Sequence, residues 1–198
     1  MVNGTRGVVF DMDDTLYLER DYVRSGYQAV ADAVAVDSIV SSQRAFDLMW
    51  HSFESGIRGK NFNHLLTQYP NLRNDWSVPG LVAVYREHQP VIDLMDGIES
   101  LIRRLRDLGV RVGIVTDGYL ATQTRKLDAL RLSEIVDHVC MTDQWGRAYW
   151  KPHPRGFELV AARLGLGGHN LVYVGDNPGK DFQTPIALGW HSVRLRVA

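Results

Sequence analysis

Short apolar runs that end in polar residues are the clearest pattern along the chain. They cover residues 7–10, 110–115, 136–141, 171–174 and 192–195. Apolar runs of this length are typical of strands that are buried on both faces of a sheet. We therefore expect five strands, of which those at residues 7–10 and 110–115 are buried.

From residue 98 onward, apolar residues at helical spacing separate these runs. The expected helices cover residues 98–108, a segment ending near 130, residues 155–164 and a segment ending near 188. At the first helix, Asp96 and Glu99 predict a capping box with Asp96 as the N-cap. Helices that alternate with buried strands predict an α/β fold with a Rossmann-like parallel sheet.

The segment from about residue 19 to 91 has a different pattern. Its apolar residues recur at helical spacing, and glycines and prolines interrupt it without any strand pattern. We therefore expect an all-helical domain, residues 17–95, inserted into an α/β core formed by residues 1–16 and 96–198.

Composition narrows the classes of function. The chain has 198 residues, of which 45% are hydrophobic, and its net charge of -1 gives no bias toward nucleic acid. No apolar run approaches the roughly 18 residues of a membrane helix, and no secretion signal is present, so we expect a cytoplasmic protein without a membrane partner. The single cysteine, Cys140, provides neither a disulfide framework nor a cysteine metal site.

Three carboxylates follow the first apolar run within four positions: Asp11, Asp13 and Asp14. Like charges crowded at the end of a buried segment are costly unless a bound cation or a shared proton offsets them. Ligands of open α/β sheets bind beyond the carboxyl ends of the strands. The end of the first strand is therefore a candidate ligand site.

Polar residues also follow the later runs. Thr116 ends the second run, Asp176 follows the fourth, and Asp181 comes five positions later. Lys151 precedes Pro152 on the approach to a helix N-terminus, where an anion is favoured. Carboxylates, a hydroxyl and an ammonium group are the groups that phosphoryl transfer onto a carboxylate needs, with Mg²⁺ bound by oxygen ligands.

These residues resemble the motifs of a known family. Asp11-Met12-Asp13-Asp14-Thr15, then Thr116, then Lys151-Pro152, then Gly175-Asp176-x-x-x-x-Asp181 are similar, in this order, to the four motifs of the haloacid dehalogenase-like (HAD) superfamily. The helical insertion resembles the cap that many members carry between the first and second motifs. An acid at position 13 favours the phosphatase branch over the dehalogenases.

The resemblance implies a role for each residue. Asp11 would be the nucleophile and Asp13 the general acid and base, while Thr116 and Lys151 would bind the phosphoryl group. The metal ligands would be Asp11, the backbone carbonyl of Asp13, Asp176 and, directly or through another ligand, Asp181. For Asp181 a plain helix N-cap is an alternative interpretation. The cofactor would be Mg²⁺.

The implied activity is hydrolysis of a small phosphorylated metabolite, a sugar phosphate or a nucleotide, through an aspartyl-phosphate. Four basic residues of the insertion are candidates for substrate specificity, with solvated helix faces as the alternative: Arg20, Arg24, Arg58 and Lys60. A phosphomutase of the same family and a catalytically silent phosphometabolite-binding module remain alternative functions. We expect a monomer or a homodimer.

Overall fold

The computed structural model describes residues 4–36 and 40–196. The chain forms two compact units: Met1–Glu19 with Ile92–Ala198, here called the core unit, and Arg20–Val91, here called the helical unit. In the described residues no helix has the length and apolar character needed to cross a membrane.

A five-stranded sheet forms the centre of the core unit. The strands are β1 (Gly7–Phe10), β2 (Arg111–Thr116), β3 (His138–Met141), β4 (Leu171–Gly175) and β5 (His191–Arg194). Their order is β3-β2-β1-β4-β5, and every neighbouring pair is parallel. All the carboxyl ends therefore lie at the same edge of the sheet.

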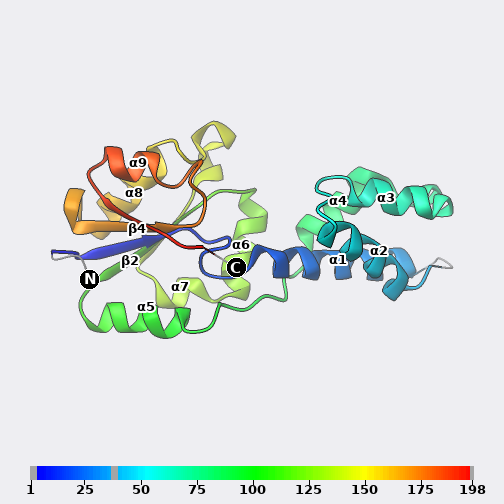
Figure 1. Ribbon diagram of the computed structural model, residues 1–198, viewed down its shortest axis with the longest axis horizontal. Helices are drawn as coiled ribbons and strands as arrows, with labels where there is room; N and C mark the ends of the chain where they lie inside the picture. Colours follow the sequence, from blue (N-terminus) through cyan, green and yellow to red (C-terminus); the bar gives the residue numbers. More distant parts are fainter. Residues whose placement is uncertain (1–3, 37–39, 197–198) are drawn as a thin grey trace. The chain divides into compact units, whose positions relative to one another are not determined.

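Helices cover both faces of this sheet, with α5 and α7 on one face and α8 and α9 on the other (Figure 1). Their bounds are α5 Ile98–Asp107, α6 Leu120–Ala129, α7 Leu132–Ile135, α8 Arg155–Leu164 and α9 Gln183–Ala187. Short 3-10 turns cover Thr142–Trp145, Arg147–Tyr149 and Gly168–Asn170. The expected α/β fold with a Rossmann-like parallel sheet is confirmed.

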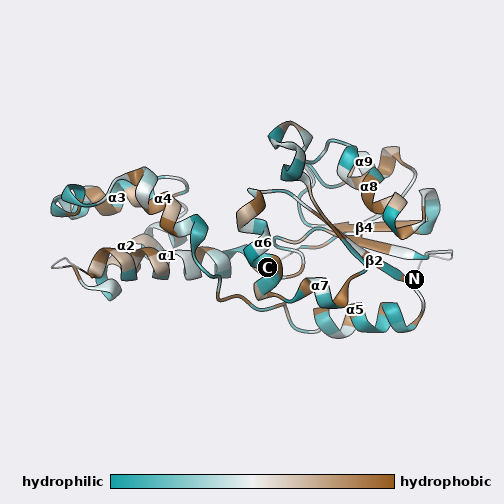
Figure 2. Cartoon of the chain, turned by 180° about the vertical axis from the view of Figure 1, so that it is seen from behind, coloured by the Kyte–Doolittle hydropathy of each residue, from teal (hydrophilic) through white to brown (hydrophobic). Residues whose placement is uncertain are grey.

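The apolar strands lie between the helices, which turn their polar faces outward (Figure 2). Phe157 of α8 is fully buried against Tyr173 of β4, with the two rings edge to face at 5.1 Å. Burial of one such side chain stabilises the fold by about 1.5–3 kcal/mol. This packing holds α8 on the sheet, and Lys151 lies four residues before that helix.

The helical unit contains α1 (Glu19–Ala35, which begins one residue before the unit), α2 (Ser42–Glu54), α3 (Asn61–Gln68), a 3-10 helix (Pro70–Asn74) and α4 (Val78–Glu87). Ser41 and Ser77 cap α2 and α4 because their side chains accept hydrogen bonds from Arg44 N and Gly80 N. The unit has its own hydrophobic cluster, formed by residues such as Val30, Met49, Leu65 and Leu81.

One detail of the sequence-based prediction and one alternative interpretation are wrong. The N-cap of α5 is Gly97, with a φ of 82°, and no side chain caps this helix end, so Asp96 and Glu99 form no capping box. The N-cap of α9 is Phe182, so Asp181 does not cap that helix. In both places a backbone turn, which the motif spacing does not reveal, sets where the helix begins.

Candidate active site

The residues predicted from strand ends gather at the carboxyl edge of the sheet. Phe10 pairs with Ile114 of β2 and with Val174 of β4, so Asp11 lies beside the ends of both neighbouring strands. The Asp11 backbone N–H donates to the carbonyl of Val174 at 2.8 Å, which extends the ladder by one residue. Strand pairing therefore fixes the position of this carboxylate.

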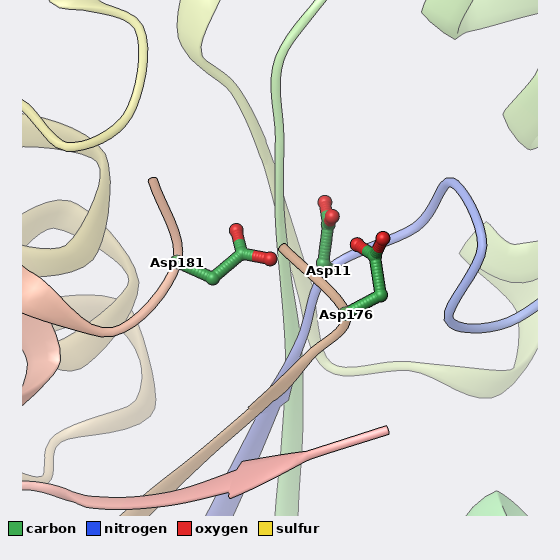
Figure 3. Close-up of side chains that lie close together, drawn as sticks. All are labelled: Asp11, Asp176 and Asp181. Atoms are coloured by element: carbon green, nitrogen blue, oxygen red, sulfur yellow. The ribbon is translucent and has the colours of Figure 1, made fainter. Parts of the chain in front are cut away.

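Three carboxylates converge at this edge. Asp11, Asp176 and Asp181 each offer an oxygen, and these oxygens lie within 4.8 Å of one another. In Figure 3, Asp11 and Asp176 extend side by side, and Asp181 points toward them from the loop after β4. Burial, and then the charges of Asp181 and Asp14, raise the pKa of Asp176 above its ordinary value. The carboxylates of this cluster therefore repel one another more than nearby positive charges offset.

Lys151 supplies one buried positive charge. Its side chain is fully buried, and its Nζ donates to Asp11 Oδ1 at 2.6 Å, to Asp181 Oδ1 at 2.8 Å and to the Tyr173 hydroxyl at 3.1 Å. Burial alone would lower the pKa of Lys151, but the charges of Asp11, Tyr173 and Asp181 raise it well above its ordinary value. Lys151 is therefore an ammonium ion held against the predicted nucleophile.

Asp11 keeps one oxygen free of hydrogen bonds. Its Oδ2 is buried and has no hydrogen-bond partner among the described residues, while Oδ1 is bound by Lys151. Burial raises the pKa of Asp11 to about 6, although the Lys151 ammonium opposes this. A buried carboxylate oxygen without a partner is costly unless a ligand satisfies it.

A divalent cation fits these donors. Mg²⁺ prefers oxygen ligands and is commonly bound by one or two carboxylates. Asp11 belongs to the three-carboxylate cluster, and a cation bound there would also offset the repulsion between the acids. The Asp13 carboxylate is not part of this cluster, which leaves its backbone carbonyl as the ligand that the family resemblance implies.

Asp13 has a separate set of partners. Its Oδ1 accepts hydrogen bonds from Lys126 Nζ at 2.6 Å and from the Tyr17 hydroxyl, and its Oδ2 accepts one from Gln123 Nε2 at 3.0 Å. Burial would raise the pKa of Asp13, but the Lys126 ammonium and these hydrogen bonds lower it below its ordinary value. The positive charge that offsets the Asp13 carboxylate is therefore the ammonium group of Lys126.

Thr116 lies at the end of β2 and is fully buried. Its Oγ1 accepts a hydrogen bond from Gln123 Nε2 at 2.7 Å and donates to the Asp117 carbonyl at 3.4 Å. The second bond is long, so a phosphoryl oxygen could replace the carbonyl as the acceptor.

Asp117 has a positioning role that its place in the sequence did not reveal. Its Oδ1 accepts hydrogen bonds from the Lys151 backbone N–H at 2.9 Å and from the Thr142 hydroxyl at 2.7 Å. Its Oδ2 lies 3.8 Å from Lys180 Nζ. Asp117 therefore fixes the backbone from which Lys151 reaches Asp11.

Asp181 belongs to the three-carboxylate cluster and also binds Lys151. Its Oδ1 accepts from Lys151 and its Oδ2 accepts from the backbone N–H of Asn177 at 2.9 Å. The side chain also lies close against Gly175, because a Cβ there would fall 2.6 Å from Asp181 Oδ2. Gly175 thus leaves the space that this carboxylate occupies.

The four basic candidates of the helical unit have different surroundings. Arg20 and Arg24 lie over the same Trp50 ring, and Arg20 also lies 3.7 Å from Glu54 Oε1. Arg58 stacks on the Phe53 ring. Lys60 is the N-cap residue of α3 and its side chain makes no capping bond. Their role in specificity stays a prediction.

Gln123 and Lys126 were missed in the sequence, although a signal was present. Both lie on the buried face of α6 together with Leu127. A glutamine and a lysine on an apolar helix face indicate buried polar partners. Their partners, Asp13 and Thr116, lie on other strand ends and cannot be identified from the helix alone.

A family model described as haloacid dehalogenase-like hydrolase matches residues 5–189. The chain therefore belongs to the haloacid dehalogenase-like hydrolase family. The sequence-based identification of this family, and of an enzyme from its phosphatase branch, is confirmed.

Curated relatives and solved structures agree with this assignment. A glyceraldehyde 3-phosphate phosphatase from Methanocaldococcus jannaschii is 26% identical over 96% of this chain and 84% of the relative. Pyrophosphatase PpaX from Bacillus pumilus is 23% identical over 86% of this chain and 74% of the relative. A HAD-superfamily hydrolase of subfamily IA, variant 1, from Geobacter sulfurreducens has the same fold, with a TM-score of 0.69, 18% identity and coverage of 96% of this chain and 87% of that one.

Proposed function

We propose that the protein is a Mg²⁺-dependent phosphomonoesterase that hydrolyses a small phosphorylated metabolite, a sugar phosphate or a nucleotide, through an aspartyl-phosphate on Asp11. The observation that carries the proposal is the buried Oδ2 of Asp11, which has no partner among the described residues and lies on the same carboxylate that Lys151 binds. A nucleophile needs one such oxygen unblocked.

In the first step, a carboxylate oxygen of Asp11 attacks the phosphorus of the substrate. The bond from phosphorus to Asp11 forms as the bond from phosphorus to the leaving oxygen breaks, and Asp13 gives a proton to that oxygen. Lys151 and the hydroxyl of Thr116 donate hydrogen bonds to the phosphoryl oxygens as their charge shifts.

In the second step, a water oxygen attacks the same phosphorus. Asp13 takes a proton from this water, and the bond between phosphorus and Asp11 breaks, which releases inorganic phosphate and restores the carboxylate. The lowered pKa of Asp13 favours its ionised form, which accepts this proton, and the proton it then carries is the one that it gives to the leaving oxygen of the next substrate.

The residues that would hold Mg²⁺ are Asp11, Asp176 and Asp181, with the backbone carbonyl of Asp13. The ion would supply positive charge to the carboxylates and to the phosphoryl oxygens. The HAD hydrolase YfnB from Bacillus subtilis, 21% identical and with a TM-score of 0.67, has a crystal structure bound to magnesium. This likeness supports the choice of metal.

Two features support a small substrate. Curated relatives over most of the chain are named for glyceraldehyde 3-phosphate and for pyrophosphate. The sequence also predicts that the helical unit acts as a cap over the site, which would exclude bulky phosphoproteins and water during the first step. The four basic residues of that unit would then contact the leaving group.

Phosphate release tests this proposal. Wild type and Asp11→Asn are assayed with Mg²⁺ and with EDTA, on p-nitrophenyl phosphate and on a panel of sugar phosphates and nucleotides. We expect Mg²⁺-dependent release that Asp11→Asn reduces to background, while the exposed Asp107→Asn on α5 leaves it unchanged. A rearranged phosphorylated product would indicate a phosphomutase, and Mg²⁺ binding without turnover on the whole panel would indicate a binding module.

A further inference from the structure

Helix α6 carries two polar side chains on its buried face. The exposed fractions of Gln123 and Lys126 are 1% and 4%, and Leu127 of the same face is buried beside them. A buried ion pair adds little stability compared with apolar residues of similar size, because both charges lose their water. Stability alone therefore does not account for these two residues.

Gln123 joins two groups of the proposed mechanism. Its Nε2 donates to Thr116 Oγ1 at 2.7 Å and to Asp13 Oδ2 at 3.0 Å. Since Lys126 and Tyr17 bind the other oxygen of Asp13, both oxygens of this carboxylate are fixed in direction. The side chain of Asp13 still keeps 20% of its surface exposed, so it remains accessible to a ligand.

The turn after Thr116 is shaped around this amide. Gly118 has a φ of 124°, and a Cβ there would lie 2.9 Å from the side-chain amide carbon of Gln123. Any larger residue at position 118 would displace the glutamine. The close approach of Gly118 is a second feature, independent of the hydrogen bonds, that fixes the position of the Gln123 amide.

We propose that Gln123 is a positioning residue that holds the Asp13 carboxylate and the Thr116 hydroxyl at a fixed separation. Proton transfer to the leaving oxygen and binding of the phosphoryl oxygens are then aligned in one complex. Because the hydroxyl of Thr116 accepts a hydrogen bond from the amide, its own proton is left to donate to the phosphoryl group. The inference rests on the proposed roles of Asp13 and Thr116.

The test compares two leaving groups. Phenyl phosphate leaves as a stronger base than p-nitrophenyl phosphate, so its cleavage depends more on a proton from Asp13. In Gln123→Met, which keeps the side-chain volume without the donor, we expect kcat for phenyl phosphate to fall about tenfold more than kcat for p-nitrophenyl phosphate. Gly118→Ala should change the ratio of the two kcat values in the same direction. Asp13→Asn, which removes the proton donor altogether, should give the largest change in this ratio.

The same substitution at an exposed glutamine, Gln68→Met at the end of α3, is the control and should leave the ratio unchanged. If Gln123→Met fails to fold, Gln123→Glu, which replaces the donor by an acceptor, is measured in its place. If only metabolites of the panel are hydrolysed, the loss must fall on kcat for the fastest of them and leave KM unchanged.

If the wild type is active and Gln123→Met loses kcat equally on both esters, or loses none, the inference is overturned. The proposed function would still hold. A wild type that releases phosphate from neither ester and from no metabolite of the panel would overturn both. Loss of activity in Asp11→Asn together with an unchanged ester ratio in Gln123→Met separates the two ideas.

Discussion

At the scale of single residues, the site is a balance between carboxylates and a few buried cations. Lys151 offsets Asp11 and Asp181, and Lys126 offsets Asp13. The unpartnered oxygen of Asp11 remains uncompensated, and its burial raises the pKa of this carboxyl to about 6. Mg²⁺ bound by the three carboxylates Asp11, Asp176 and Asp181 would restore the balance of charge.

The raised pKa of Asp11 predicts a pH dependence for Mg²⁺ binding. The metal binds the ionised carboxylate, so protons compete with it below about pH 6 and affinity rises as pH rises. Titration calorimetry should show affinity about tenfold weaker at pH 5 than at pH 7, with little further gain above pH 7. In Asp11→Asn this pH dependence should weaken, because only Asp176, whose pKa is also raised, would still compete for protons. Equal affinity at pH 5 and pH 7 in wild type would contradict the assignment.

The sequence predicted the residues that end strands, because all parallel strands end at one edge of the sheet. Asp11, Thr116 and Asp176 could be placed together for this reason. Gln123 and Asp117 could not, because their roles depend on hydrogen bonds to residues on other elements. Local pattern identifies a buried polar residue but does not identify its partner.

At the scale of elements, the close packing of α8 on β2 helps to fix the position of Lys151, which lies four residues before α8. Gly113 of β2 lies under α8, where a Cβ would fall 2.7 Å from Val160 Cγ1 and 3.3 Å from Leu164 Cδ1. The strands were predicted from short apolar runs that end in polar residues, and α8 was predicted from apolar residues at helical spacing. The alternative interpretation of Asp181 as the N-cap of α9 is wrong, because Phe182 occupies that position.

Gly113→Ala should therefore destabilise the core unit. The added methyl group overpacks the contact between β2 and α8, which costs about 1–3 kcal/mol in the free energy of unfolding. Urea unfolding measures this change. Gly167→Ala is the control, because Gly167 has an extended φ of -164° and nothing lies within 4 Å of the added Cβ. Equal stability of the two variants would contradict this view of the packing.

At the scale of the whole molecule, the chain divides into two units that each bury their own hydrophobic cluster. The sequence predicted an inserted helical segment because the alternation of helices and strands stops there. Its expected bounds, residues 17–95, extend beyond the observed unit, Arg20–Val91. The difference arises partly because Met95 N–H donates to the carbonyl of Leu16 at 2.9 Å, a pairing that no sequence pattern reveals.

The activity proposed for the molecule depends on one covalent step, the transfer of a phosphoryl group to Asp11. The most direct test is mass spectrometry of Asp13→Asn mixed with p-nitrophenyl phosphate and Mg²⁺ and quenched in acid. This variant lacks the base of the second step, while the good leaving group needs little help in the first, so the intermediate should accumulate. We predict one phosphoryl group on the peptide that contains Asp11. Turnover by wild type with no phosphoryl group on that peptide, in wild type or variant, would contradict the account.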